Sequence, residues 1–344
     1  MSLPALPPAP RSPWQRLYGA LLAWRRGRLA RAARRLPVPV VSIGNLHLGG
    51  GGKTPMAIAI ASRLESAGWK VAILSRGYRR TSRGPRIVSR GAGPLLDPAA
   101  AGDEPHLLAR RLPGVAVVVA ERRFEGGELA LEALDPRPNL LLLDDGFAHV
   151  ALARDLDLLL FPAADPWAGG RLLPSGRLRE PLAAAAVADA ALLTGLAEPL
   201  AGGEGAELAR ALAAAGFRGA GFAAATVAGP PRLLDGVELA AGTPVFAAAA
   251  IARPESLFTL AERLGLRVTG RRGFPDHHDF AESDLRDLER EARARGAAAL
   301  LVSEKDVAKI EGRTGLPLAV LPIEARPEPA FWDWLEGRLA ELPG

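Results

Sequence analysis

Short apolar runs alternate with amphipathic helical stretches through the part of the chain that follows residue 37. This alternation is typical of a mostly parallel sheet with helices on both faces. The apolar runs predict strands at 38–43, 70–74, 115–120, 139–143, 156–161 and 190–194. The amphipathic stretches predict helices at 54–67, 104–111 and 125–133. The pattern therefore indicates an α/β fold.

The apolar pattern changes at about Pro199, where a long stretch rich in alanine and glycine begins. The sequence Gly-Pro-Pro at 229–231 interrupts this stretch. We therefore interpret the stretch as a connection between two domains. Beyond it we expect a second α/β unit, with strands at 244–249, 298–303 and 317–323, a turn at 252–254 and a helix at 255–264. The expected domains are 37–228 and a smaller one at 229–344.

The first 36 residues have a helical pattern of their own. An apolar face repeats at i, i+3, i+4, i+7 and i+8, at Trp14, Leu17, Tyr18, Leu21 and Leu22. Arginines surround and extend this face, which suits either an anionic membrane surface or the protein's own core. The apolar stretch 17–24 is far shorter than the roughly 20 residues that span a bilayer. We therefore expect an amphipathic arm, 1–36, that lies on a membrane surface as a peripheral or monotopic helix.

Charge is distributed unevenly along the chain. The formal net charge is +5, but no acidic residue precedes Glu65, whereas ten basic residues do. The rest of the chain is slightly acidic, so the basic character belongs to the arm. This argues against a nucleic-acid binder and for a local contact with anions. The chain has no cysteine, which excludes disulfides, thiolate nucleophiles and zinc sites built on sulfur.

A glycine-dense turn follows the first expected strand and leads directly into a helical pattern. This strand, loop and helix order is the context that a phosphate-binding P-loop requires. The expected contacts to phosphate come from Gly49, Gly50, Gly51, Gly52, Lys53, Thr54 and Pro55. Lys53 supplies a charge to the β and γ phosphates of ATP, and the Thr54 hydroxyl supplies a ligand for Mg²⁺. The strict pattern fails at one position, where His47 replaces the first glycine, and the alternative is a glycine-rich turn without a ligand.

Two carboxylates, Asp144 and Asp145, end the expected strand 139–143. Ligands gather at the carboxyl ends of parallel strands, so these side chains are expected to reach the Mg²⁺ that a P-loop holds. The alternative is an ordinary Asp-Gly turn.

Three further polar segments have open interpretations. Asp103 starts an expected helix, either as its N-cap or as a general base for a hydroxyl group. The loop 171–181 carries three arginines and is either a clamp for a substrate phosphate or a solvated basic loop. The segment 274–280 places two histidines and two aspartates between aromatic residues, which suits metal ligation or a catalytic histidine oriented by an aspartate.

Taken together, these segments resemble the tetraacyldisaccharide 4'-kinase family of lipid A biosynthesis. The resemblance runs in order from Val40 to Lys309. It rests on Ser42-Ile43-Gly44-Asn45, Gly49 to Pro55, Leu74-Ser75-Arg76-Gly77-Tyr78, Gly102-Asp103-Glu104-Pro105, Asp144-Asp145-Gly146-Phe147 with His149, Leu178-Arg179-Glu180-Pro181, Phe274 to His278 and Ser303-Glu304-Lys305-Asp306. The family also has an irregular P-loop. This chain departs from it at His47, where a small hydroxyl residue is usual, and at Ala148, where glutamine is usual.

The resemblance implies a P-loop kinase that uses ATP and Mg²⁺. It would transfer the γ-phosphoryl group to the 4'-hydroxyl of an acylated glucosamine disaccharide 1-phosphate, giving lipid IVA. It implies Asp103 as the base, paired with His277, and Asp144 and Asp145 at the magnesium. Contacts to the substrate are expected from Arg76, Arg123, His149, Arg179 and Glu180. The expected location is the cytoplasmic face of the bacterial inner membrane, with no obligate protein partner.

A different class of protein remains as the alternative: a P-loop switch or metallochaperone-type protein at the membrane surface, whose output is a conformational change. The absence of cysteine counts against a metal carrier. The arginine-bearing loop and the Asp-His-His segment favour a second substrate.

Overall fold

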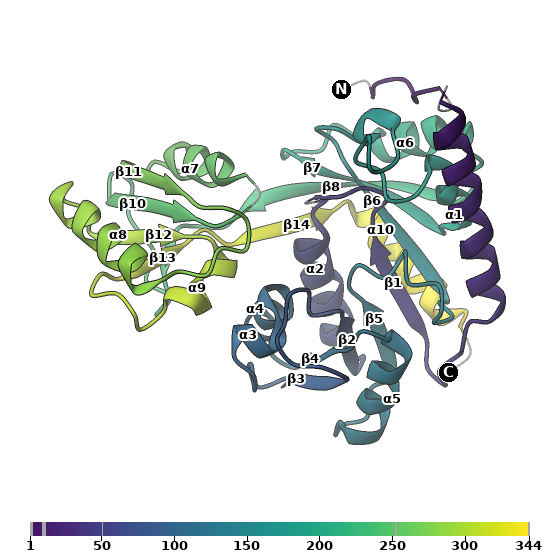
Figure 1. Ribbon diagram of the computed structural model, residues 1–344, viewed down its shortest axis with the longest axis horizontal. Coiled ribbons are helices and arrows are strands. Elements are labelled where there is room, and N and C mark those ends of the chain that lie inside the picture. Colours follow the sequence, from purple (N-terminus) through teal and green to yellow (C-terminus); the bar gives the residue numbers. More distant parts are fainter. Residues whose placement is uncertain (1–2, 9–11, 50, 252, 343–344) are drawn as a thin grey trace.

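The chain forms two sheets, a large one and a small one, joined side by side (Figure 1). The computed structural model describes residues 3–8, 12–49, 51–251 and 253–342. Gly50 of the expected phosphate contacts and residue 252 of the expected turn lie outside the described residues.

The large sheet has nine strands in the order β14-β8-β7-β6-β1-β5-β2-β4-β3. Its strands are β1 (Val40–Gly44), β2 (Val71–Ser75), β3 (Arg86–Arg90), β4 (Ala116–Val119), β5 (Leu140–Leu143), β6 (Leu156–Pro162), β7 (Ala190–Leu196), β8 (Ala220–Ala228) and β14 (Ile323–Pro327). All pairings are parallel except those of the two edge strands, β3 and β14. The central strands are buried on both faces, which explains why they have continuous apolar sequences. The expected mostly parallel α/β sheet is confirmed.

The helices cover both faces of this sheet. They are α1 (Pro13–Arg31), α2 (Lys53–Ser66), α3 (Pro98–Ala101), α4 (Asp103–Arg111), α5 (Arg123–Ala133), α6 (Glu204–Ala213) and α10 (Pro329–Ala340), with 3₁₀ turns η1 (Ala168–Gly170) and η2 (Leu182–Val187). Apolar residues of α2, α4 and α10 form one core cluster with the sheet. Residues of α5 and α6 pack in two other clusters that involve alternate residues of the same strands. The sheet is therefore the middle layer of three.

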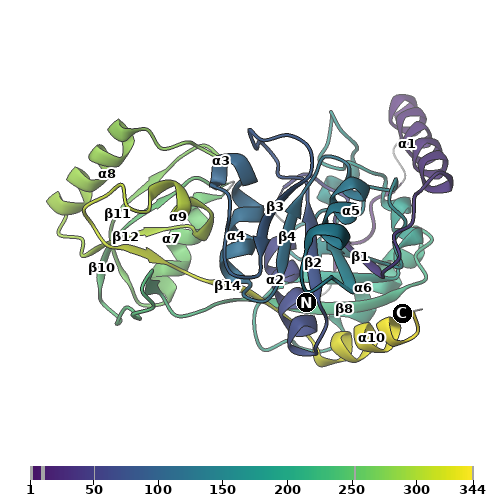
Figure 2. The same ribbon diagram turned by 90° about the horizontal axis from the view of Figure 1, so that it is seen from below.

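The small sheet lies at one end of the molecule (Figure 1). Its order is β11-β10-β12-β13-β9, with β9 (Arg232–Leu233), β10 (Pro244–Ala249), β11 (Arg267–Gly273), β12 (Ala299–Val302) and β13 (Leu318–Val320). Helix α7 (Pro254–Arg263) packs on one face, and α8 (Glu282–Ala294) and α9 (Glu304–Ile310) pack on the other. Seen from below, α9 and α4 lie between the two sheets (Figure 2).

The topology differs from the expected domain division in two segments. The stretch after Pro199 is not only a connection, because it contains α6 and β8, the strand next to the edge strand β14. The last segment does not stay with the small sheet: β14 pairs with β8, and α10 buries Phe331, Leu335 and Leu339 in the core of the large sheet. Alanine and glycine dominate 199–228, so the apolar periodicity that announces a helix or strand is weak there.

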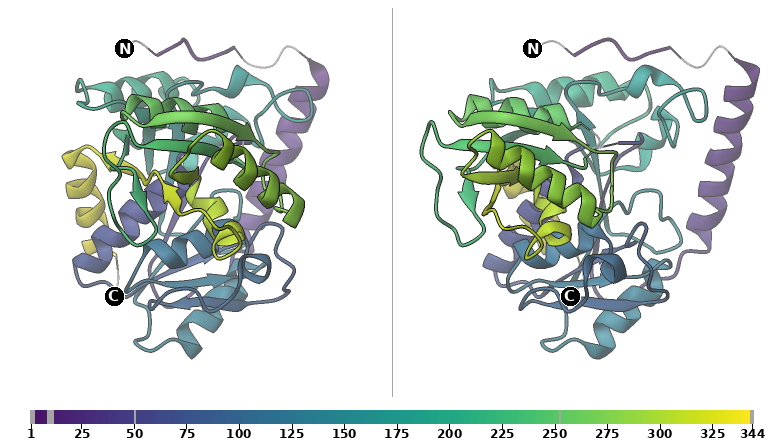
Figure 3. Two further views of the ribbon diagram at one scale, coloured as in Figure 1. Left: turned by 90° about the vertical axis from the view of Figure 1, so that its left-hand side faces the viewer. Right: turned by 60° about the vertical axis from the view of Figure 1, so that its left-hand side comes forward.

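Helix α1 lies along the outer side of the large-sheet unit, at the end of the molecule opposite to the small sheet (Figures 1 and 3). The arm packs on the protein through Leu22 and Gly19, which face the cluster around Leu172. The rest of the apolar stripe faces outward: Trp14, Leu17 and Leu21 are 79%, 63% and 55% exposed. The alternative in which the whole stripe packs on the core is therefore wrong. Among the described residues, no helix is long and apolar enough to cross a bilayer.

Candidate active site

The segment 45–52, which the sequence predicts to be a P-loop, connects β1 to α2 at the carboxyl edge of the large sheet. Strand β1 ends at Gly44, and α2 begins at Lys53, so the loop spans the residues between them. Gly51 packs so closely that a Cβ would lie 2.8 Å from the Asn45 amide nitrogen. Gly52 has φ +76°, a conformation that favours glycine. Thr54 and Pro55 follow Lys53 in the first turn of α2, so three of the expected nucleotide contacts lie at one helix N-terminus.

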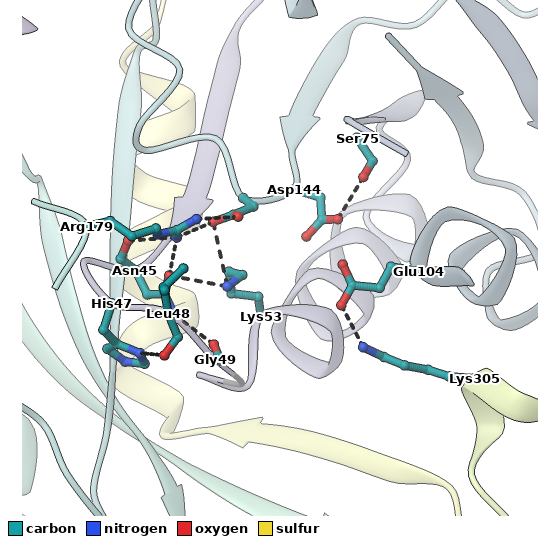
Figure 4. A network of polar contacts seen from close by, with 11 residues as sticks. Asn45, His47, Leu48, Gly49, Lys53, Ser75, Glu104, Asp144, Arg179 and Lys305 are labelled. Carbon is teal, nitrogen blue, oxygen red and sulfur yellow. Dashed lines mark hydrogen bonds and ion pairs between the residues drawn. The ribbon is translucent and has the colours of Figure 1, made fainter. Parts of the chain in front are cut away.

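Lys53 lies beside a fixed acidic group. Its Nζ lies 3.2 Å from Asn45 Oδ1 and 3.6 Å from Asp145 Oδ1 (Figure 4). Arg179 donates two hydrogen bonds to the same carboxylate, at 2.9 and 2.8 Å, and also bonds to the backbone and side chain of Asn45. The backbone of the 171–181 loop pairs with the P-loop stem, from Leu48 N to Arg177 O and from Arg179 N to Leu46 O. This arginine-bearing loop is thus part of the site's frame, and its interpretation as a merely solvated loop is wrong.

The carboxylates after β5 have opposite electrostatic environments. Burial raises the pKa of Asp144 to about 6, and the charges of Glu104 and Asp145 act in the same direction. Burial also acts on Asp145, but hydrogen bonds from Arg179 and the charge of Lys53 lower its pKa to about 2. Asp144 accepts a hydrogen bond from Ser75 at the end of β2, at 3.0 Å. The ends of β1, β2 and β5 therefore meet at the carboxylates of Asp144 and Asp145, as the sequence predicts for adjacent parallel strands.

This set of groups fits a magnesium nucleotide. Within the described residues, no three His, Cys, Asp or Glu side chains are grouped to hold a metal ion by themselves. Mg²⁺ in phosphoryl-transfer sites is usually bound by one or two protein oxygens together with substrate phosphates. Asp144, Asp145 and the Thr54 hydroxyl are protein oxygens of this kind, and the positive environment of Lys53 suits the phosphates.

Asp103 is the first residue of α4, and its carboxylate faces the small-sheet unit. Asp103 Oδ2 lies 2.9 Å from His277 Nδ1 and accepts a hydrogen bond from Lys309 Nζ at 2.7 Å. Its interpretation as the N-cap of the helix is wrong, because Gly102 occupies that position and no side chain caps the helix. His277 has φ +62°, a rare conformation for a residue with a side chain.

The neighbouring histidine points elsewhere. His278 Nε2 lies 2.9 Å from Asp284 Oδ2 on α8, and its ring stacks on Phe274. The 274–280 segment thus divides its two histidines between the Asp103 contact and the small-sheet core.

A second basic group, Arg123, lies near Asp144 and Asp145. Arg123 begins α5, is buried, and donates to Ala120 O at 2.7 Å. Burial lowers its pKa to about 10, against the opposing charges of Asp144 and Asp145. His149 Nε2 lies 3.1 Å from Glu121 O, and Arg76 is exposed but close enough to influence the pKa of both Arg123 and His149. Three of the expected substrate contacts are therefore neighbours.

Glu180 contacts the N-terminal arm. Its Oε2 lies 2.7 Å from Arg26 Nη1 of α1, and both side chains are largely buried. Arg26 also donates to Phe147 O and lies 4.0 Å from the centre of the Phe147 ring. The expected substrate residue Glu180 therefore has a structural partner, and it joins the arm to the loop that carries Arg179.

Two site residues, Thr194 and Lys309, were not singled out in the sequence, and two others, Asn45 and Lys305, appeared only as members of longer motifs. Thr194 lies in the distant strand β7 and donates to Gly51 O at 3.0 Å, which only the tertiary structure reveals. Lys305 Nζ donates to Glu104 at 2.6 Å (Figure 4). The composition could have drawn attention to both lysines of α9. The chain has 43 Lys and Arg residues, and lysine is rare among them, so each lysine is an exception to the use of arginine.

Comparison with known proteins identifies the family. The family model described as Tetraacyldisaccharide-1-P 4'-kinase matches residues 11–340. The chain belongs to this family.

Members of the tetraacyldisaccharide 4'-kinase family match most of the chain. The tetraacyldisaccharide 4'-kinase of Anaeromyxobacter dehalogenans is 45% identical over 302 residues, which cover 86% of this chain and 77% of that protein. The one from an Acidovorax species is 39% identical over 334 residues, covering 96% and 90%. The crystal structure of the "apo" form of LpxK from Aquifex aeolicus in complex with ATP has 31% identity and a TM-score of 0.73, and it covers 95% of this chain and 97% of that one. The chain is thus a kinase, and the expected family and fold are confirmed.

Proposed function

We propose that this site transfers the γ-phosphoryl group of ATP to the 4'-hydroxyl of a tetraacyl disaccharide 1-phosphate lipid, with Asp103 as the base. One observation carries the proposal: the Asp103 carboxylate at the start of α4 is held by His277 and Lys309, and the next residue, Glu104, is close enough to Asp144 for its charge to raise the pKa of that aspartate. The membership of the kinase family supports the choice of substrate.

The residues divide the reaction between them. Lys53 and the P-loop amides hold the β and γ phosphates, and Arg123 adds positive charge near Asp144 and Asp145. Asp103 accepts the proton of the 4'-hydroxyl while the oxygen forms a bond to the γ-phosphorus and the bond to the β-phosphate oxygen breaks, so that ADP leaves. Because the transition state is loose, positioning and charge neutralisation matter more than the strength of the base.

Asp144, Asp145 and Thr54 would hold Mg²⁺. The ion would supply positive charge that neutralises the charge developing on the phosphates during transfer. Arg179 keeps Asp145 ionised in advance, and Lys53 keeps it oriented toward the phosphates.

The exposed face of α1 supports binding to an anionic membrane surface, where an acylated substrate resides. Its apolar side chains point away from the protein, and the arginines Arg25 and Arg28 lie next to them on the helix. Apolar insertion and attraction to lipid phosphates act together on such a helix. We therefore propose a peripheral or monotopic enzyme of the cytoplasmic face of the inner membrane.

The test is to incubate the purified full chain with Mg²⁺, ATP labelled in the γ-phosphate and a tetraacyl disaccharide 1-phosphate in detergent, and to separate the lipids. We expect a labelled lipid, and we expect Lys53→Ala and Asp103→Ala each to lower kcat by about 100-fold or more with the circular dichroism spectrum unchanged. Asp287→Ala, a carboxylate change on α8 remote from the site, is the control and keeps wild-type turnover. ATP hydrolysis without a labelled lipid would favour the switch class instead, and normal turnover of Asp103→Ala would remove it as the base.

A further inference from the structure

Helix α9 of the small-sheet unit reaches the start of α4 with two lysines. Lys305 and Lys309 are one helical turn apart, so they project from the same face of α9. They bind two consecutive residues: Lys305 Nζ donates to Glu104 at 2.6 Å, and Lys309 Nζ donates to Asp103 at 2.7 Å. Two other ion pairs, Arg111–Glu304 and Arg110–Glu311, join the same helices farther along. The site and the small-sheet unit therefore meet through α4 and α9.

The two partners of Asp103 occupy the same oxygen. Lys309 Nζ and His277 Nδ1 both bind Oδ2. Within the described part of the chain, Oδ1 accepts no hydrogen bond, and it is not among the buried atoms that lack a partner, so it is not completely buried. When two donors bind one oxygen of a carboxylate, they fix the orientation of the whole group. The other oxygen and its lone pairs then point in a defined direction.

We propose that Lys309 is a positioning residue of the phosphoryl transfer: it holds Oδ2 of Asp103 together with His277, so that Oδ1 faces the attacking 4'-hydroxyl. The inference rests on the proposed role of Asp103 as the base. Lys309 itself does not touch the substrate in this arrangement. It acts through the orientation and the ionisation of Asp103.

Burial makes this contact strong enough to matter. The side chains of Lys309 and Asp103 are only 9% and 14% exposed, so water competes weakly for either partner. Lys309 also donates to His278 O at 3.3 Å, which fixes its ammonium group relative to the segment that carries His277. The three groups therefore form one hydrogen-bonded unit that closes only when α9 lies against α4.

The charges around Asp103 predict the direction of a pH effect. Burial alone would raise the pKa of Asp103, but hydrogen bonds from Lys309 and His277 outweigh it and lower that pKa. The charge of Asp103 also influences the pKa of two other titratable groups, His106 on the same helix and Asp306 on α9. Removing Lys309 takes away the largest stabilising contact of the ionised form, so the pKa of Asp103 must rise.

The experiment compares Lys309→Met with the wild-type full chain in the labelled-lipid assay between pH 5 and pH 9. We expect kcat to fall by about 10-fold or more, KM for ATP to change by less than about 2-fold, and the ascending limb of the kcat profile to move to higher pH. Glu311→Gln is the matched control, because it breaks an ion pair between the same helices without touching Asp103. We expect it to keep the wild-type kcat and pH profile.

Two further variants separate this inference from the proposed function. Asp103→Asn and the double variant Asp103→Asn, Lys309→Met are expected to have the same residual kcat, because Lys309 acts only through Asp103. If Asp103→Asn keeps normal turnover, the base assignment itself is lost. If Asp103→Asn is inactive but Lys309→Met has a normal kcat and pH limb, only the inference about Lys309 is overturned. Should Lys309→Met not fold, Lys309→Gln is used with the same expected pH shift.

Discussion

His149 shows how the residues around Asp144 and Asp145 are kept neutral or charged by their neighbours. It lies near two guanidinium groups, those of Arg123 and Arg76, and it is partly buried. Burial lowers its pKa to about 4, and the charge of Arg123 acts in the same direction. A neutral imidazole next to these two cations adds no repulsion for the arginines, which therefore remain available for phosphate or substrate oxygens.

The low pKa of His149 has a consequence for stability. In the unfolded chain its pKa is near 6.5, so the unfolded state binds more protons than the folded state between pH 6.5 and 4. The free energy of unfolding is therefore highest above pH 6.5, and it decreases as pH falls toward 4. We expect His149→Gln to lose less unfolding free energy than the wild type when urea unfolding is compared at pH 7 and pH 5. Equal losses in the two proteins would mean that His149 is not held neutral in the folded state.

At the scale of elements, α1 combines two faces with different tasks. Residues Gln15, Leu22 and Arg26 face the protein, where Gln15 bonds to Ser175 and Arg26 to Glu180. The opposite face carries the exposed apolar side chains. The spacing of the stripe predicted the helix but not this division, because Leu22 belongs to the stripe and yet packs inward. Which side of a helix meets the protein depends on the surface it lies on, and that surface is formed by residues more than a hundred positions away.

We predict that Leu17→Ser combined with Leu21→Ser weakens binding to liposomes that contain anionic lipids. Both side chains are exposed, so their replacement removes insertion into the bilayer and leaves the packing of the protein intact. Flotation of the full chain with liposomes measures the binding, and thermal unfolding in solution is expected to be unchanged. Leu22→Ser is the matched control on the inner face, and it is expected to lower thermal stability while leaving the apolar outer face in place. Unchanged flotation of the double variant would assign the exposed face another role.

At the scale of the whole molecule, the chain enters the small sheet once and leaves it once. Strand β8 leads out of the large sheet and β14 leads back, and the two are paired side by side (Figure 1). The glycine-rich loop between a strand and a helix and the aspartates after β5 were predictable, because each depends on a few consecutive residues and on the strand or helix beside it. The return of β14 and the contacts of Lys309 were not, since they depend on which distant segments become neighbours.

The returning segment makes the large sheet depend on the end of the chain. Phe331 of α10 is completely buried and packs edge-on against Phe222 of β8 and against Trp332. We predict that Phe331→Ala lowers the unfolding free energy by about 3–5 kcal/mol, the cost of emptying a large buried site. Urea unfolding measures this loss. Asp333→Ala, an exposed position two residues later on the same helix, is the control and is expected to change it by less than about 0.5 kcal/mol. Because α10 contributes no residue to the P-loop or to the Asp103 contact, the folded Phe331→Ala protein is expected to keep the wild-type kcat at low temperature. A small loss of stability, similar to that of Asp333→Ala, would mean that the large sheet folds independently of its C-terminal helix.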